Sequence, residues 1–135
     1  MKTQHLLLAA LFITGLQSCR EDGHDHDHDK DGNPPTIQIN NPRKSMYEVG
    51  DTAFVNVVVS DEKELHEASC YFITTPQNDT LWQQKRHAHS KTINFNSFYR
   101  IGVLPEKQLV DFVVVAENAT GKTTRASQRF EVHQH

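Results

Sequence analysis

Histidine alternates with aspartate in one short stretch of the chain, which reads His24, Asp25, His26, Asp27, His28, Asp29. In an extended chain every second side chain projects to the same side, so the three imidazoles face one way and the carboxylates the other. Imidazole nitrogens together with a carboxylate oxygen suit zinc, copper or nickel. Because an imidazole must lose its proton to bind, affinity should fall as the pH drops through the histidine range. The stretch therefore predicts a divalent transition-metal site, with zinc the first choice.

Two other interpretations of this stretch stay open. Asp27, Asp29, Asp31 and Gly32 resemble the start of a calcium loop, but the twelfth position falls on Gln38, where a bidentate Glu is expected. The stretch has no apolar residue before position 36, so it also fits a disordered, solubilising spacer. Its similarity to the His-Asp loops of bacterial zinc-uptake proteins favours metal contact.

A second group of histidines lies further along the chain. His87 and His89 stand two residues apart, so both project from the same side of an extended segment, and His66 begins a nearby predicted strand. These three residues are candidates for two or three more metal ligands. Lys85 and Arg86 repel a cation, however, and an exposed polar strand edge is the alternative.

The start of the chain has the features of an export signal. A charged Lys2 precedes an apolar run, 6–16, that is too short to span a bilayer comfortably. The run ends in the sequence Leu-Gln-Ser-Cys, which resembles the bacterial lipobox and predicts removal of residues 1–18 and lipidation of Cys19. Acyl chains would then hold the protein at a membrane. The residues that follow, 20–22, resemble the surface-export signal of Bacteroidetes lipoproteins, which implies an outer-membrane protein facing the periplasm or the cell surface.

Composition and motifs exclude several classes of function. From residue 33 onward the chain carries eleven acidic and eleven basic residues, so it lacks the basic excess that nucleic-acid binding needs. Cys70 has no intrachain partner if Cys19 is lipidated, and its place in an alternating segment predicts a small buried residue. No catalytic motif is present, so the sequence predicts that the protein is not an enzyme.

The rest of the chain alternates between apolar and polar residues, as short strands do. Strands are predicted at 36–39, 52–60, 66–75, 80–89, 91–98, 100–104, 109–116 and 123–132. Seven or eight strands in about 100 residues favour an all-β, immunoglobulin-like Greek-key sandwich, because one open sheet would leave an apolar face in water. We therefore expect a tether at 19–35, one domain at 36–132 and a short tail at 133–135.

The last predicted hairpin carries a resemblance. Residues 116–121 read Ala-Glu-Asn-Ala-Thr-Gly, which resembles the turn near the end of fibronectin type III and bacterial immunoglobulin-like domains. The segments 35–37 and 49–51 resemble the start of such domains. Over its whole length the chain is similar to a family of Bacteroidetes lipoproteins built from a lipobox, a His-Asp tether and one such domain. The resemblance implies the fold and the anchor but no reaction.

Two functions follow as expectations. The first is a membrane-anchored lipoprotein whose tether binds zinc, copper or nickel and passes the ion to an outer-membrane transporter or holds it in reserve. The second is an adhesion, glycan-binding or protein-binding module for which the tether is only a spacer. Trp82, Tyr71 and Tyr99 are candidates for an aromatic sugar platform, although core and rim positions are the more common use of such residues.

Overall fold

The computed structural model describes residues 32–134, so Cys19 and the His-Asp stretch at 24–29 lie outside the described residues. The described part is all-β, with the strands β1 (Thr36–Asn41), β2 (Met46–Glu48), β3 (Thr52–Thr75), β4 (Thr80–Arg100), β5 (Gln108–Asn118) and β6 (Thr123–His133). Between residues 32 and 134, no helix is long and apolar enough to cross a membrane.

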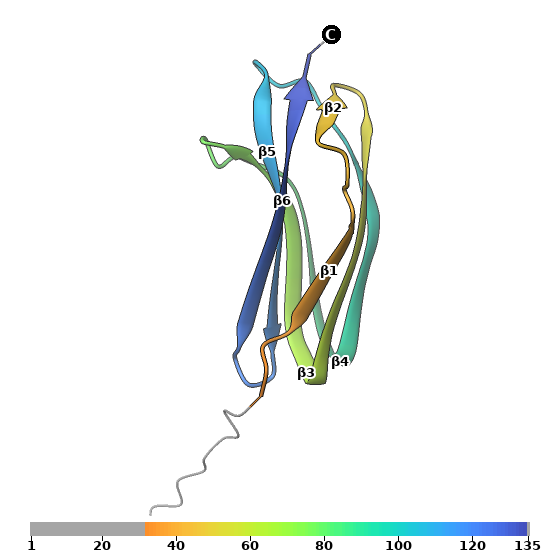
Figure 1. Ribbon diagram of the computed structural model, residues 1–135, viewed down its shortest axis with the longest axis vertical. Coiled ribbons are helices and arrows are strands. Elements are labelled where there is room, and N and C mark those ends of the chain that lie inside the picture. The colour runs from red at the N-terminus through yellow and green to blue at the C-terminus, as the bar shows by residue number, and fades with distance from the viewer. Residues whose placement is uncertain (1–31, 135) are drawn as a thin grey trace, which may run out of the picture.

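The six strands form one curled, mixed sheet (Figure 1). Along the sheet the order is β1, β3, β5, β6 and β2, and β4 pairs with the other edge of β3 along nearly the whole of that strand, from Thr52 to Ile73. All neighbouring strands run antiparallel except β2, which lies parallel to the end of β6. The long strand β3 is the centre of this arrangement because it pairs with three others.

Two pairs of predicted strands are joined in the structure. The segments 52–60 and 66–75 are parts of one strand, β3, and 80–89 and 91–98 are parts of β4, so the prediction of separate strands there was wrong. The ladder between β3 and β4 has register shifts between Ser60 and Glu67. Bulges of this kind let a strand bend without leaving its ladder. The first half of β3 therefore pairs with β1, and the second half pairs with β5.

Two shorter predictions also differ from the structure. The strand predicted at 100–104 is absent, because β4 ends at Arg100. The next residue, Ile101, instead exchanges backbone hydrogen bonds with the turn after β2: its N–H donates to Asp51 O, and Gly50 N–H donates to Ile101 O, each at 2.9 Å. The short strand β2 was not predicted, because three residues are too few to show a period.

The core joins both halves of β3. Odd-numbered residues of its first half, such as Val55 and Val57, are buried, whereas even-numbered residues such as Phe72 are buried in its second half. The register shifts change the buried positions from odd-numbered to even-numbered residues. One side of β3 therefore faces the core in both halves of the strand. Phe95 of β4 and Phe112 of β5 complete the contact between the halves.

The turn between β5 and β6 is organised by Asn118, which is 3% exposed. Its side-chain Oδ1 accepts hydrogen bonds from Thr120 N at 3.2 Å, Thr120 Oγ1 at 2.8 Å and Lys122 N at 2.9 Å. Gly121 has a φ of +79°, a left-handed conformation that glycine adopts without strain. The hairpin predicted from this sequence is thus confirmed, and Asn118 explains why the turn holds its shape.

Candidate metal site

Three of the histidines predicted as ligands lie together on the outer surface of the β3–β4 pair. His66 comes from β3, and His87 and His89 come from β4. Their ring centroids are 4.5 Å apart for His66 and His87, 5.2 Å for His87 and His89, and 6.0 Å for His66 and His89. We call these residues the histidine cluster. Side chains more than twenty positions apart in the sequence therefore form one group.

Strand alternation and one bulge place the histidine cluster. His87 and His89 share a side of β4 because side chains alternate with a period of two. On β3, Glu67 pairs with His87, but Leu65 pairs with Ser90, so the ladder shifts around His66. Leu65 and Ala68 are both buried, so the shift between them leaves His66 and Glu67 both outside the core, with His66 beside the β4 histidines.

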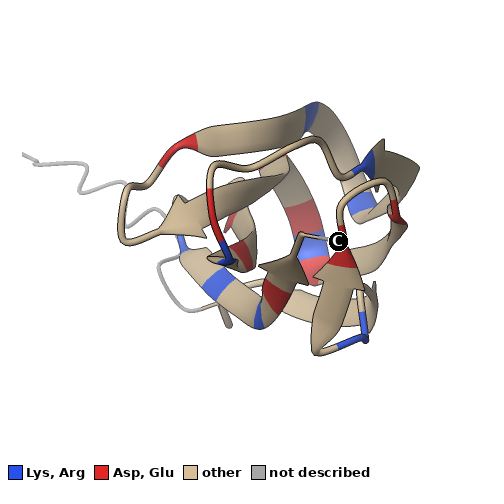
Figure 2. Ribbon diagram, turned by 90° about the horizontal axis from the view of Figure 1, so that it is seen from above, with Lys and Arg blue, Asp and Glu red and all other residues tan. Residues whose placement is uncertain are grey.

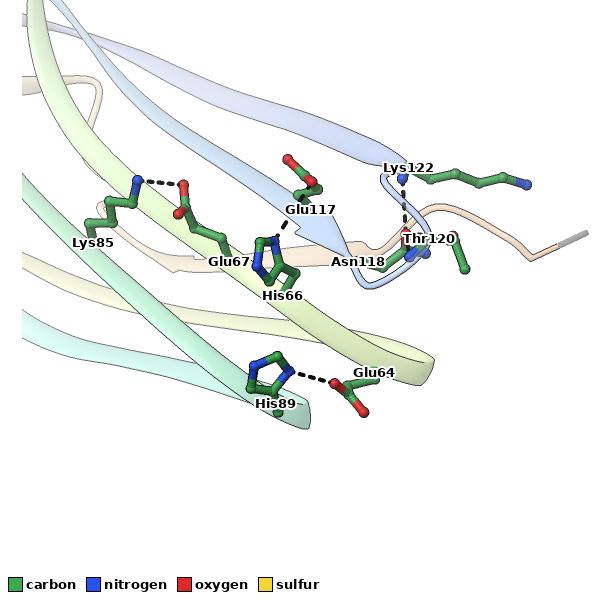
Figure 3. A network of polar contacts seen from close by, with 9 residues as sticks. All are labelled: Glu64, His66, Glu67, Lys85, His89, Glu117, Asn118, Thr120 and Lys122. Atoms are coloured by element: carbon green, nitrogen blue, oxygen red, sulfur yellow. Dashed lines mark hydrogen bonds and ion pairs between the residues drawn. The ribbon is translucent and has the colours of Figure 1, made fainter. Parts of the chain in front are cut away.

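A carboxylate lies beside each of two of the rings (Figure 3). His89 Nδ1 lies 2.6 Å from Glu64 Oε1, and His66 Nδ1 lies 3.8 Å from Glu117 Oε1. When Nδ1 faces a carboxylate, Nε2 on the opposite side of the ring is left to bind a metal, and protein metal sites commonly orient histidine in this way. Glu64 is thus within hydrogen-bond distance of His89, and Glu117 faces His66 at a longer distance.

The spacing of the rings fits a shared ion. A zinc ion lies about 2.1 Å from an imidazole nitrogen and so about 3.2 Å from the ring centroid, which puts the centroids of two tetrahedral ligands about 5.2 Å apart. The three observed separations bracket this value. Among residues 32–134, no group of three or more His, Cys, Asp or Glu side chains is arranged so that it could hold a metal ion. Binding at the cluster thus requires the rings to turn, and the exposure of His66 (44%) and His89 (65%) leaves room for that.

The two neighbouring cations bear less on the cluster than the sequence indicated. Lys85 Nζ lies 2.7 Å from Glu67 Oε1, so a carboxylate offsets its charge. Arg86 pairs with the buried Ala68 in the ladder and lies over the ring of Phe95, 5.8 Å from the centroid. It projects to the opposite face of β4 from His87, because neighbouring residues of a strand face opposite ways. The carboxylates near the cluster thus outnumber its cations.

The chain enters the domain at the same end as the histidine cluster. Asn118 Nδ2 donates a hydrogen bond to Asn33 O at 3.2 Å, and Lys122 Nζ donates one to Gly32 O. Residue 117, next to Asn118, is the glutamate that faces His66. Ala119 N–H donates to Glu64 O at 3.0 Å, and the Glu64 side chain holds His89. A short series of contacts therefore joins the point of entry to the cluster.

The remaining predicted site residues lie outside the described part of the chain; they are Cys19, His24, Asp25, His26, Asp27, His28 and Asp29. Cys70 is fully buried, and burial raises the pKa of its thiol to about 12. A thiol with that pKa is protonated at neutral pH, which disfavours it as a nucleophile or a metal ligand.

The aromatic residues considered for a sugar platform do not form one. Trp82 and Tyr99 each lie 5.5 Å, centroid to centroid, from the buried ring of Phe72, and both pack against the core. The hydroxyl of Tyr71 accepts a hydrogen bond from Arg125 Nη1 at 3.2 Å. Because Tyr71 is next to the buried Phe72 in β3, its side chain projects to the opposite face of the sheet from Trp82 and Tyr99.

No protein-family model and no curated protein sequence matches the chain. Among solved structures, the chain is similar to Spo0M, a sporulation control protein from Bacillus subtilis, with 12% identity and a TM-score of 0.44. That match covers 76% of this chain and 49% of Spo0M, so the chain spans about half the length of that protein. It is also similar to a superoxide reductase (neelaredoxin) from Ignicoccus hospitalis, with 10% identity, a TM-score of 0.43 and coverage of 76% of this chain and 82% of the reductase. At TM-scores below 0.5, the likeness extends to a β-rich architecture and to nothing functional.

Proposed function

We propose that this protein is a membrane-anchored lipoprotein that binds a divalent transition metal through its His-Asp tether and its histidine cluster. The observation that carries the proposal is the meeting of His66, His87 and His89, with Nδ1 of two of the rings facing a carboxylate. Zinc fits best, because it accepts imidazole and carboxylate ligands without a strong geometric demand, and copper and nickel share this preference for imidazole.

The point of entry supports a site shared between tether and domain. His28 is four residues before Gly32, so at about 3.5 Å per residue it reaches up to about 14 Å from that point. Gly32 and Asn33 are held by the same hairpin that carries Glu117, and Glu117 faces His66. One ion can thus take three nitrogens from the domain and a fourth from the tether. A flexible segment that finds preoriented ligands loses less conformational entropy on binding than one that must wrap an ion alone.

The proposed setting is the outer membrane, with Cys19 lipidated and the domain facing the periplasm or the cell surface. Held there, the protein passes its ion to an outer-membrane transporter or keeps it as a reserve. The acidic residues of the tether, with a net charge of −4 over positions 20–32, concentrate cations near the membrane.

We also read the curled sheet as an immunoglobulin-like sandwich of the kind found in Bacteroidetes lipoproteins. In this interpretation β1 and the segments 52–60 and 92–100 form one layer, and the remaining strands form the other. The pairings of the two halves of β3 support it, because each half has its own neighbours. The parallel pairing of β2 with β6 closes the second layer.

Calorimetric titration of the full chain in detergent with zinc, copper and nickel tests the metal function. Three variants are compared with the intact protein: His24, His26 and His28 changed to Ala; His66, His87 and His89 changed to Ala; and His133→Ala as the control. We expect one equivalent of zinc to bind with micromolar or tighter affinity, and each triple variant to lose about tenfold or more. His133 pairs with Glu131, away from the cluster, so its variant should bind as the intact protein does.

The outcomes separate the parts of the proposal. If the cluster variant binds as tightly as the intact chain, the domain supplies no ligands. If the tether variant does so, the tether is a spacer. If the intact chain binds none of the three metals, the function proposed here is wrong.

A further inference from the structure

One outer face of the sheet is almost without charge. It is built by β1, residues 52–60 of β3 and residues 92–100 of β4, which are joined in consecutive ladders. These segments contain one charged residue, Arg100, at the very end of β4. Elsewhere in the described chain, acidic and basic residues are interspersed (Figure 2). An uncharged face of three strands therefore contrasts with the rest of the surface.

A line of carboxamides crosses this face from strand to strand. Gln38 Nε2 donates to Asn40 Oδ1 at 3.0 Å, and Asn40 Nδ2 donates to Asn56 Oδ1 at 2.8 Å. Asn56 Nδ2 then donates to Asn96 Oδ1 at 2.6 Å. A primary amide has two N–H donors and two lone pairs, so each member keeps hydrogen-bonding capacity after these contacts. The line presents fixed donors and acceptors to the solvent side.

Two exposed phenylalanines lie next to this line. Phe54 and Phe98 are paired directly across β3 and β4, and they are 63% and 65% exposed. Residues paired in this way have Cβ atoms about 5 Å apart, and the next pair on the same face, Asn56 with Asn96, lies about 7 Å further along. Phenylalanine has no polar atom that gains from contact with water, so the pair is an apolar platform beside a row of amides.

We infer that this face, defined by Gln38, Asn40, Phe54, Asn56, Asn96 and Phe98, binds an uncharged polysaccharide. One side of a pyranose ring is made of C–H bonds and stacks on an aromatic ring, while the hydroxyls at its edge both donate and accept hydrogen bonds. The two phenylalanines supply the stacking surface, and the carboxamides supply partners that also donate and accept. A face that extends across three adjacent strands suits an extended chain of sugars.

The charge of the face decides against other occupants. Nucleic acids and acidic polysaccharides require several cations, and this face offers one arginine at its end. A neutral ligand loses no ion solvation when it covers a neutral surface, so its binding is insensitive to salt. The face is also separate from the histidine cluster, which lies beyond the bend of β3, so sugar binding should not depend on metal.

Electrophoresis of the full chain in detergent through gels that contain a polysaccharide tests the inference. The probes are xyloglucan, mannan and laminarin, which are neutral, and polygalacturonate, which is acidic. The test variant is Phe54→Ala with Phe98→Ala, whose side chains are exposed and contribute little to the core. The matched control is Val103→Ala, an exposed apolar residue away from this face, at 83% exposure.

We expect at least one neutral polysaccharide to retard the intact protein and the control, with and without a metal chelator. The double variant should lose this retardation, which corresponds to an affinity lower by about tenfold or more. The inference is overturned if no neutral polysaccharide retards the intact chain, or if the double variant is retarded equally. It is also overturned if sedimentation shows a dimer that the double substitution dissociates, because the face would then bind a second copy of this chain.

Discussion

Asn118 provides a direct test of how the site end of the domain is held. Replacing it by alanine removes three hydrogen bonds to Oδ1 and two from Nδ2, the latter to Asp61 Oδ2 at 3.0 Å and to Asn33 O. At about 1 kcal/mol net for each bond, the upper limit is about 5 kcal/mol. Because Thr120 is exposed and Lys122 is partly exposed, water satisfies some of the freed groups. We therefore expect a loss of about 2–3 kcal/mol in the free energy of unfolding.

Urea denaturation followed by tryptophan fluorescence measures this loss, since Trp82 packs against the core. The variant Asn118→Asp is the matched comparison: it keeps the acceptor for Thr120 and Lys122 but places a second carboxylate against Asp61. It should be destabilised at neutral pH and recover part of its stability in acid, where the carboxylates are protonated. A change below about 0.5 kcal/mol for Asn118→Ala would refute the reasoning.

Three further outcomes are expected. Val114→Asp should abolish folding, seen as loss of the β-type circular dichroism spectrum, because an unpaired carboxylate at a fully buried position costs several kcal/mol, comparable with the stability of a small domain. Cys19→Ser should release the protein from membranes; if it still sediments with them after a high-salt wash, the lipobox interpretation is wrong. Hydrogen bonds from the Arg129 guanidinium lower the pKa of Asp111, so this pair stabilises the fold above the unfolded-state pKa of about 3.9 and the effect disappears as the pH falls through the lower folded-state pKa. Asp111→Asn should therefore lower stability by about 1 kcal/mol at pH 7 and by progressively less toward about pH 2, and a difference independent of pH would contradict this.

Local sequence patterns predicted most of the strands, but they did not predict that neighbouring predicted strands join into the long strands β3 and β4. Alternation located the buried side of 52–60 and of 66–75, because burial on one face leaves a period of two. The charged segment 61–64 has no such period, so its sequence predicts a connection between two strands. In the structure Asp61 Oδ1 accepts hydrogen bonds from Lys63 N at 2.9 Å and Glu64 N at 3.0 Å, so the segment shapes a bend within β3. A side chain that bonds to the nearby backbone gives no periodic signal.

The histidine cluster, too, is predicted from the sequence only in part. That His87 and His89 share a side follows from their spacing, and the sequence indicated this directly. That His66 joins them depends on the register shift between Leu65 and Glu67, which the pairing of two strands determines. Glu117 reaches His66 from β5, fifty-one positions later in the chain, so no local motif could have identified it.

We propose that the histidine cluster binds a metal through Nε2 of its rings. Long-range proton–nitrogen NMR of the histidine side chains tests this most directly, with the full chain in detergent and zinc added to one equivalent. We expect the Nε2 resonances of His66, His87 and His89 to shift together, and those of Nδ1 in His66 and His89 to change less. If only the histidines at 24, 26 and 28 respond and the three cluster residues keep their metal-free resonances, the cluster is not a metal site.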